Sequence, residues 1–412
     1  MRETMTSIEA STPSGGSRSG SKVTYPALDG LRALAITLVF IDHFGGGSHG
    51  GPLLVWFNRL RVFGASGVSL FFVLSGFLIT GILFDTRNDE HYFKNFYIRR
   101  SLRIFPIFYL VLAVCAVLTP LLHLRLQWGH LSFLFYMGNL FANWNWGLYE
   151  LISPTHPLLS INLAHFWSLF VEEQFYLLWP VAVLLIRDRR RLIIFSLTVI
   201  VLVLLLRIGM VGLLPFHVAE QFAFRMLPTR ADDLLIGGTL ALLIRGPEGK
   251  RWLERSALFF FVGILTFFGM ACWRGDFGFS DPYNLTIGLT LVSLASAGMI
   301  GLAIQTKTVA FRIFSTSPLR KIGKYSYGFY VYHVLLSKAP IAYLLWCMTF
   351  FRSMALGGLI YSSTSYLAVL GISAISYNFY EKRFLAIKSQ FQYASRTNVS
   401  EADDRSIHSI SN

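Results

Sequence analysis

The sequence predicts an all-α polytopic membrane protein with about ten transmembrane helices. Of its 412 residues, 54% are hydrophobic and only 14% are charged, against roughly 25% charged residues in a typical soluble domain. The apolar residues also recur in blocks of about 18 to 22, the length needed to cross a hydrocarbon core of about 30 Å. These observations exclude a water-soluble globule of this size.

Ten apolar blocks are candidate spans. They lie at residues 28–45, 65–84, 103–122, 165–186, 192–214, 232–244, 256–273, 284–304, 325–349 and 356–379. The block at 232–244 is short for a span and could extend upstream through Arg230. One further apolar piece lies at 131–144, and a full crossing there would move every later loop to the other side of the membrane.

The distribution of Lys and Arg predicts the topology. With ten spans and a cytoplasmic N-terminus, the cytoplasmic loops hold far more basic residues than the outer loops, as the positive-inside rule requires. The piece at 131–144 is therefore predicted to be an outer re-entrant or interfacial segment. Both termini are expected in the cytoplasm of a bacterium, with the protein in its inner membrane.

Polar segments flank the predicted membrane domain, which covers residues 28–385. Residues 1–27 are rich in Ser, Gly and Thr and lack an apolar signal-peptide core, so a disordered cytoplasmic tail is expected. Residues 386–412 are polar and Ser-rich, and a second cytoplasmic tail is expected there. No appended soluble catalytic domain is expected, so the chemistry must use residues in or beside the membrane.

Net charge and cysteines exclude other classes of function. The formal charge of +14 is spread over loops between apolar blocks, and no basic soluble domain suited to nucleic acid is present. The cysteines, Cys115, Cys272 and Cys347, are far apart and lack Cys-x-x-Cys spacing. Neither a disulfide framework nor a metal site is expected.

Arg32 and His43 are the leading pair of candidate functional residues in the first span. Eleven residues of helix turn three times plus about 20° and rise about 16 Å, so both side chains share one face. Arg32 would lie near the cytoplasm and His43 in the outer half, a separation comparable to an extended phosphopantetheine arm. The alternative is a snorkelling anchor and an interfacial histidine.

Three arginines, Arg99, Arg100 and Arg103, open the third span. The three-residue spacing of Arg100 and Arg103 makes them neighbours on a helix surface, and guanidinium groups suit phosphate oxygens. A simple topology anchor is the competing interpretation.

Two adjacent glutamates, Glu172 and Glu173, lie about two turns inside the fourth span, at a predicted depth similar to that of His43. A carboxylate there is costly unless it is paired or hydrated. Glu172 could orient an imidazole or bind a sugar hydroxyl. Because neighbouring helical residues point about 100° apart, at most one glutamate is expected to face the same partner, and Glu173 is a candidate for substrate binding.

Further candidates for substrate binding lie in later spans. Arg230, Asp232 and Asp233 at the predicted outer mouth of the short span could bind a polar acceptor or cap the helix. His333 lies near mid-membrane on a Tyr-rich segment, where a core histidine bonded to a backbone carbonyl is the alternative.

Six motifs in order resemble the acyltransferase-3 family of integral membrane O-acyltransferases. They cover residues from about 25 to 384 and read "LDGLRALAITLVFIDHF", "LFFVLSGFLITG", "FYIRRSLRIFP", "HFWSLFVEEQFYLLWP", "TRADDLLIGG" and "IGKYSYGFYVYH". Each motif is moderately specific, whereas the ordered set is strongly so.

The resemblance implies ten core helices and an acyl-CoA donor, with acetyl-CoA expected and no tightly bound cofactor. It implies acceptors such as lipopolysaccharide sugars, exopolysaccharide, peptidoglycan or macrolides. Some members carry a fused C-terminal SGNH-type domain; without it, a separate periplasmic partner enzyme is conceivable. The family motifs fall on Arg32 and His43, on Ser75, Gly76 and Phe77, on Arg100 and Arg103, and on Glu172.

The predicted reaction is general-base catalysis in which His43 takes the proton of an acceptor hydroxyl as it attacks the thioester. Glu172 could hold the imidazole in the useful tautomer, and an acyl-histidine intermediate is an open variant. Ser75 could donate to the developing oxyanion or serve close helix packing. The rival functions are a transporter or flippase of a polar lipid or glycan precursor and a structural membrane scaffold.

Overall fold

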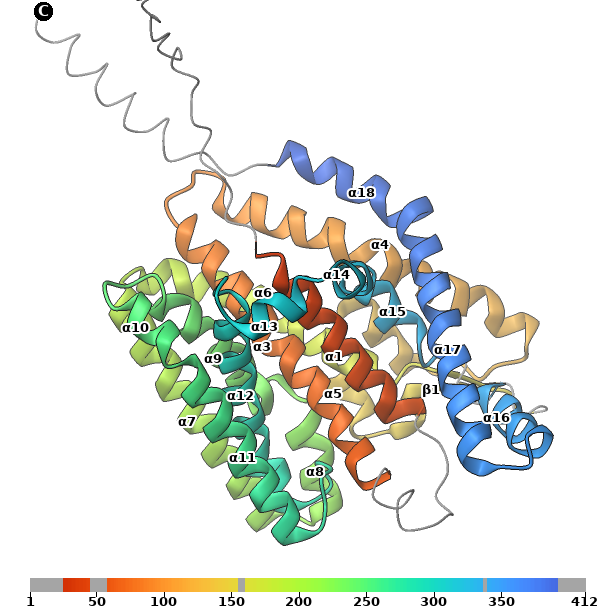
Figure 1. Cartoon of the computed structure of the whole chain (residues 1–412). Helices are drawn as coiled ribbons and strands as arrows, with labels where there is room; N and C mark the ends of the chain where they lie inside the picture. The colour runs from red at the N-terminus through yellow and green to blue at the C-terminus, as the bar shows by residue number, and fades with distance from the viewer. Residues whose placement is uncertain (1–24, 45–57, 155–159, 336–338, 392–412) are drawn as a thin grey trace, which may run out of the picture. The chain divides into compact units, whose positions relative to one another are not determined.

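Helices make up nearly all of the part of the chain that the structure describes (Figure 1). The computed structural model describes four ranges, residues 25–44, 58–154, 160–335 and 339–391. Within them a single two-stranded sheet is present, in which β1 (Glu150–Ile152) pairs antiparallel with β2 (Ser160–Asn162) and Leu151 lies opposite Ile161. The predicted all-α class is confirmed.

The helices of the first half are α1 (Ala27–Phe44), η1 (Val62–Ala65), α3 (Ser66–Asp85), α4 (Tyr92–Leu121), η2 (Trp128–Phe135), α5 (Gly138–Ala142), η3 (Trp146–Tyr149) and α6 (Phe166–Ile186). Those that follow up to residue 303 are α7 (Arg189–Leu213), α8 (Phe216–Arg225), α9 (Leu227–Leu243), α10 (Gly249–Glu254), α11 (Ser256–Arg274), the π-helical turn η4 (Asn284–Gly288) and α12 (Leu289–Ala303). The last are α13 (Val309–Phe314), α14 (Ser317–Lys324), α15 (Ser326–Tyr332), α16 (Ala339–Phe350), α17 (Met354–Ser376), the π-helical turn η5 (Tyr377–Glu381), α18 (Lys382–Ile387) and η6 (Lys388–Gln390).

Seven helical stretches of the described residues are long and apolar enough to cross a membrane. They are Asn58–Asp85, Tyr92–Leu121, Phe166–Ile186, Arg189–Leu213, Gly249–Arg274, Asn284–Ala303 and Met354–Gln390. The chain is thus a polytopic membrane protein, while the number of ten spans and the side on which each terminus lies stay predictions.

Two predicted spans are helices that fall short of a clear crossing. α1 has 18 residues but carries three charged side chains, Asp29, Arg32 and Asp42. α9 has 17 residues, a length of about 26 Å at 1.5 Å per residue. It begins at Leu227, so the short block does extend upstream through Arg230.

The predicted ninth span, residues 325–349, is not one continuous helix. α15 has only seven residues, and turns follow it at residues 333–335 before α16 starts at Ala339. A proline at position 340 lacks the backbone N–H that a helix interior needs, whereas it is tolerated in a first helical turn. A single unbroken helix does not cover this block, and a membrane crossing here stays a prediction.

The segment at 131–144 contains short elements only. η2 has eight residues and α5 has five, and between them Tyr136 adopts a left-handed backbone conformation with φ of 56°. Neither helix is long enough to cross a membrane, as predicted. Trp128, Phe135 and Trp144 are largely exposed, and aromatic side chains of this kind are typical of membrane interfaces.

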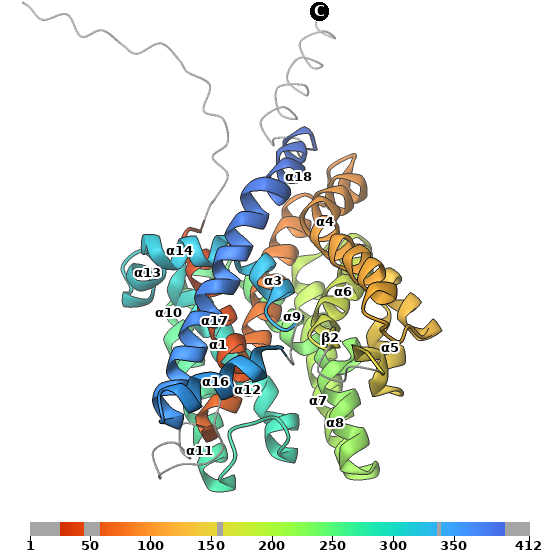
Figure 2. The ribbon, with the colours of Figure 1, turned by 90° about the vertical axis from the view of Figure 1, so that its right-hand side faces the viewer.

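α3 belongs to the most buried of the seven long stretches. It packs against α1, α6, α9 and α12, and Figures 1 and 2 show it between α1 and α9. The helices around it expose large apolar side chains, such as Leu202 and Leu205 of α7 and Leu359 of α17. An apolar outer surface is what a helix facing lipid requires.

Candidate active site

A pocket among α1, α3, α4, α6 and α15 collects most of the predicted donor-binding residues. We call it the arginine pocket; its polar lining consists of Arg32, Ser75, Arg100, Arg103, Ser168, Glu172, Tyr176, Ser326, Tyr327 and Tyr330. The remaining lining is apolar and comes mainly from α3. Residues up to about 300 positions apart in the sequence thus meet in one site.

A hydrogen-bonded chain links three of the pocket's side chains. The hydroxyl of Tyr176 donates to Oε2 of Glu172 at 3.1 Å, and the Ser75 hydroxyl lies 2.5 Å from the same Tyr176 oxygen. The guanidinium of Arg100 stacks on the Tyr176 ring, 4.1 Å from its centroid. Glu172 therefore holds Tyr176, which in turn positions Ser75 and Arg100.

The pocket has more positive than negative charge. Three arginines, Arg32, Arg100 and Arg103, line it together with the single carboxylate of Glu172. Arg32 also pairs with Asp29 one turn earlier on α1. Nε of Arg100 is buried and has no hydrogen-bond partner among the described residues. Guanidinium groups with unused donors are suited to bind phosphate oxygens.

Arg99 does not join the other two arginines of its motif. It donates to the carbonyl oxygens of Lys388 at 3.2 Å and of Phe391 at 2.7 Å. The one-residue step from Arg99 to Arg100 rotates the side chain by about 100° around the α4 axis, which turns Arg99 toward the C-terminal helices. Arg99 thus contacts the backbone at the two ends of η6, and its predicted role in donor binding stays untested.

His43 is held by its own helix. Its Nδ1 lies 2.9 Å from the carbonyl oxygen of Val39 one turn earlier, and because a carbonyl can only accept, Nδ1 carries the proton. Nε2 of the neutral ring then has the lone pair that a general base needs. Val39 thus supplies the tautomer control that was expected from Glu172. Glu172 accepts a hydrogen bond from Tyr176, and its predicted catalytic role stays untested.

Two further imidazoles, His333 and His165, continue from His43 into the interior. The ring centroids of His43 and His333 are 5.0 Å apart, and those of His333 and His165 are 5.2 Å apart. His43 is exposed, whereas His333 and His165 are 3% and 4% exposed. We call these residues the histidine cluster. His165 was missed, although its place at the start of a span was a usable signal.

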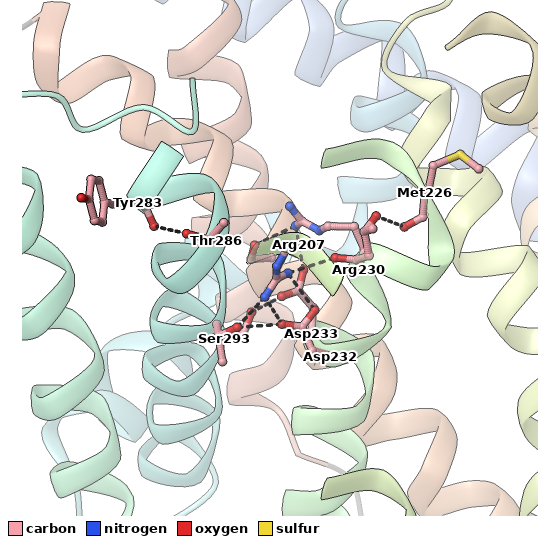
Figure 3. A network of polar contacts seen from close by, with 11 residues as sticks. Arg207, Met226, Arg230, Asp232, Asp233, Tyr283, Thr286 and Ser293 are labelled. Atoms are coloured by element: carbon pink, nitrogen blue, oxygen red, sulfur yellow. Dashed lines mark hydrogen bonds and ion pairs between the residues drawn. The ribbon is translucent and has the colours of Figure 1, made fainter. Parts of the chain in front are cut away.

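Arg230 and Asp232 lie in a buried ion network (Figure 3). Arg207 of α7 binds both carboxylate oxygens of Asp232, at 3.0 and 2.6 Å, and Arg230 pairs with Asp233 at 2.7 Å. All four side chains are fully buried. Partners within the protein offset the cost of burying these charges, and the predicted role of Arg230 and Asp232 in substrate binding stays untested.

Arg207 is a second residue that the sequence interpretation missed. An arginine inside an apolar block of 23 residues is a functional or structural signal by itself. It also donates to the carbonyl oxygen of Thr229 and to the hydroxyl of Thr290. The network therefore joins α7, α9 and η4–α12.

Glu173 faces a different environment from Glu172. It is absent from the lining of the arginine pocket, and it lies close enough to Tyr109, Tyr136 and Tyr327 to interact with them electrostatically. Its Oε1 atom has no hydrogen-bond partner among the described residues. Its predicted contact with substrate stays untested. Within the described ranges, no three His, Cys, Asp or Glu side chains are grouped as metal ligands would be.

Comparison with known proteins decides the family. The acyltransferase domain matches residues 25–378, a range that contains the whole arginine pocket and the histidine cluster. The chain belongs to the acyltransferase-3 family. It is 30% identical over 332 residues to the peptidoglycan O-acetyltransferase OatA of Listeria monocytogenes, covering 76% of this chain and 49% of that protein. It is 29% identical over 321 residues to the O-acetyltransferase OatA of Staphylococcus aureus, covering 75% and 50%.

The chain spans about half the length of these curated relatives. No solved structure gives a significant match. Membership of the acyltransferase-3 family confirms the resemblance seen in the motifs and favours an acyltransferase over a transporter. Two residues of the Ser-Gly-Phe motif make contacts with other helices. The Ser75 hydroxyl is hydrogen-bonded to Tyr176, and Gly76 lies against the backbone of Leu234 on α9.

Proposed function

We propose that this chain is a membrane O-acyltransferase that moves an acyl group from cytoplasmic acyl-CoA to a hydroxyl of a cell-surface glycan or glycolipid. The observation that carries the proposal is the convergence of Arg32, Arg100 and Arg103 in one pocket with Ser75 and Glu172. An acyl-CoA donor has phosphates that need cations and a thioester that needs hydrogen-bond donors, and the pocket supplies both.

The chemistry assigned to His43 is that of a general base. Its Nε2 takes the proton of the acceptor hydroxyl as the hydroxyl oxygen attacks the thioester carbon. A C–O bond forms, the C–S bond breaks, and the proton ends on sulfur as free CoA thiol. The Ser75 hydroxyl, which lies in the arginine pocket beside the hydroxyl of Tyr176, donates to the carbonyl oxygen during attack. Glu172 positions Tyr176 and balances Arg100.

The class of acceptor is proposed from the relatives. Their names describe O-acetyl transfer, in one case to peptidoglycan, so an acetyl group and an amino-sugar glycan are the first donor and acceptor to test. A second enzyme that completes the transfer outside the membrane is compatible with this proposal, because the matched relatives are about twice as long.

A reconstituted assay tests the proposal. We expect purified protein in liposomes to release CoA thiol from acetyl-CoA and to form an acetyl ester on chitopentaose, a soluble glycan of N-acetylated glucosamine, as detected by mass spectrometry. His43→Ala is expected to abolish both signals at equal protein content. Movement of a glycolipid across the bilayer without thioester cleavage would instead support the transporter alternative.

A further inference from the structure

Three imidazoles in contact are more than one general base requires. In the histidine cluster one nitrogen of each ring is hydrogen-bonded to a backbone carbonyl oxygen. Nδ1 of His43 bonds to Val39, Nδ1 of His333 bonds to Tyr330 at 2.6 Å, and Nε2 of His165 bonds to Val331 at 3.0 Å. The remaining nitrogen of each neutral ring therefore has a lone pair. Among the described residues, Nε2 of His333 and Nδ1 of His165 have no hydrogen-bond partner although both are buried.

A buried imidazole nitrogen without a hydrogen-bond partner carries a desolvation cost. Two such atoms in one cluster indicate a use during the reaction, when a proton arrives. His333 is the central ring, since it contacts His43 on one side and His165 on the other. His165 bonds the backbone of the segment that carries His333, so it is suited to position that ring.

The histidine cluster also borders the arginine pocket. Tyr330 lines that pocket and its ring contacts both His333 at 5.4 Å and His165 at 5.6 Å. The Tyr330 hydroxyl donates to the carbonyl oxygen of His165 at 2.6 Å and is bonded to the Ser168 hydroxyl. His333 thus lies between the exposed His43 and the wall of the pocket proposed to hold the thioester.

We propose that His43 and His333 divide the proton transfer between them. On the proposed function, Nε2 of His43 takes the proton from the acceptor hydroxyl and passes it to Nε2 of His333. His333 then delivers the proton to the CoA sulfur as the C–S bond breaks. The hydroxyl loses one proton, the thiolate gains one, and both histidines return to their neutral forms. His165 acts as a positioning residue for His333.

Leaving-group chemistry separates this role from a structural one. A thiolate of an acidic thiol leaves without protonation, whereas an alkyl thiolate gains more from a proton donor. The two donors to compare are 4-nitrophenyl thioacetate and phenethyl thioacetate, with chitopentaose as acceptor and reconstituted full-length protein. The measured quantity is the aryl-to-alkyl ratio of transfer rates, which is independent of the amount of folded protein.

His333→Gln is expected to raise the aryl-to-alkyl ratio at least about tenfold over the unmodified protein, because a positioned proton donor contributes roughly 100- to 10,000-fold. His43→Gln is expected to slow transfer from both donors, since the hydroxyl still has to be deprotonated, whereas His333→Gln is expected to leave transfer from the aryl donor near that of the unmodified protein. His165→Gln is expected to raise the ratio less than His333→Gln does.

His130→Gln is the matched control. His130 is also buried and its Nε2 also has no hydrogen-bond partner among the described residues, but it belongs to η2 and lies outside the cluster. Its ratio is expected to equal that of the unmodified protein.

An unchanged ratio in His333→Gln, or loss of transfer from both donors in both His333→Gln and His333→Asn, would overturn the division of roles. A raised ratio in His130→Gln, or unchanged transfer from the aryl donor in His43→Gln, would do the same. Failure of the unmodified protein to acylate any acceptor would count against the proposed function instead.

Discussion

Neighbouring residues on one helix have separate tasks in this site. Glu172 lines the arginine pocket and accepts a hydrogen bond from Tyr176, whereas Glu173 is absent from the pocket lining and its Oε1 atom has no hydrogen-bond partner among the described residues. Arg100 and Arg103 line the pocket, whereas Arg99 holds the C-terminal end. In both cases a single residue step of about 100° changes the partner.

Glu172→Gln is expected to lower the rate of acyl transfer at least about tenfold. The amide keeps the size of the side chain but removes the charge that balances Arg100, and a hydrogen bond to a charged group is worth about 1.5–3 kcal/mol. Glu173→Gln is the paired control and should have a smaller effect. Ester formation on chitopentaose at equal protein content measures both. Full activity in the first variant with loss in the second would reverse the assignment.

Arg103→Ala should raise the KM for acetyl-CoA about tenfold, since it removes a charge-assisted phosphate contact worth about 1.5–3 kcal/mol. Arg99→Ala should change KM less, because Arg99 donates to two backbone carbonyls and not into the pocket. Steady-state release of CoA thiol gives both values. Equal KM increases in the two variants would mean that the pocket is not where the phosphates bind.

At the scale of helices, small residues set how closely α3 and α9 approach. A Cβ built on Gly76 would overlap the carbonyl oxygen of Leu234, and one built on Gly237 would overlap that of Val73. Glycines facing each other in this way let two membrane helices pack backbone to backbone. The motif glycine next to Ser75 therefore fixes the distance from α3 to the helix that carries the buried ion network.

Gly76→Ala is expected to destabilise the protein by about 1–3 kcal/mol, the usual cost of overpacking a tight contact. Gly212→Ala on α7 is the matched control, because no atom lies within 4 Å of the position of its Cβ. Thermal unfolding in detergent should show a lower Tm for the first variant only. A normal Tm for Gly76→Ala would mean that the two helices can separate without cost.

The ion pair between Arg207 and Asp232 joins α7 to α9 (Figure 3). Removing one partner, as in Arg207→Met or Asp232→Leu, is expected to cost about 3–5 kcal/mol, since an unpaired charge stays buried. The double variant should be more stable than either single one, because both charges are gone. The Tm of all three tests this. Additive losses in the double variant would show that the pair is not a unit.

For the whole molecule, the side of the membrane on which the arginine pocket opens is a prediction from loop charge. Arg245 and Asp85, at the ends of α9 and α3, form an ion pair at 2.8 Å, so these two ends lie together. The exposed turn at Asn88 follows the same end of α3. Trp128, which is 89% exposed, belongs to the segment predicted to lie outside.

Cysteine labelling tests the predicted sides. In a protein lacking the exposed Cys272, Asn88→Cys is expected to react with a membrane-impermeant maleimide only after the cells are permeabilised. Trp128→Cys is expected to react in intact cells, because positively charged loops stay in the cytoplasm. The two positions serve as controls for each other. The reversed labelling pattern would contradict the prediction that acyl-CoA binds from the cytoplasm.

The sequence by itself determined the membrane class, the family and most of the pocket residues. Composition and block length set the class because hydrocarbon accepts only apolar, internally bonded helices. Ordered motifs identified Arg32, His43, Ser75, Arg100, Arg103 and Glu172 because each lies at a fixed spacing along its helix. Position along a helix axis can be counted from sequence, and the upstream extension of α9 was found in this way.

Only the tertiary structure decided which side chains meet. It shows that Glu172 is hydrogen-bonded to Tyr176 and not to His43. It also shows that Arg99 bonds to the C-terminal end of the described chain and that Arg207 is the partner of Asp232. It also brought His165 and His333 to His43 from two other parts of the chain. The physical reason is that helix rotation and helix pairing depend on contacts between distant segments. A rotation of 100° changes a partner entirely while leaving the apolar pattern of a membrane helix almost unchanged.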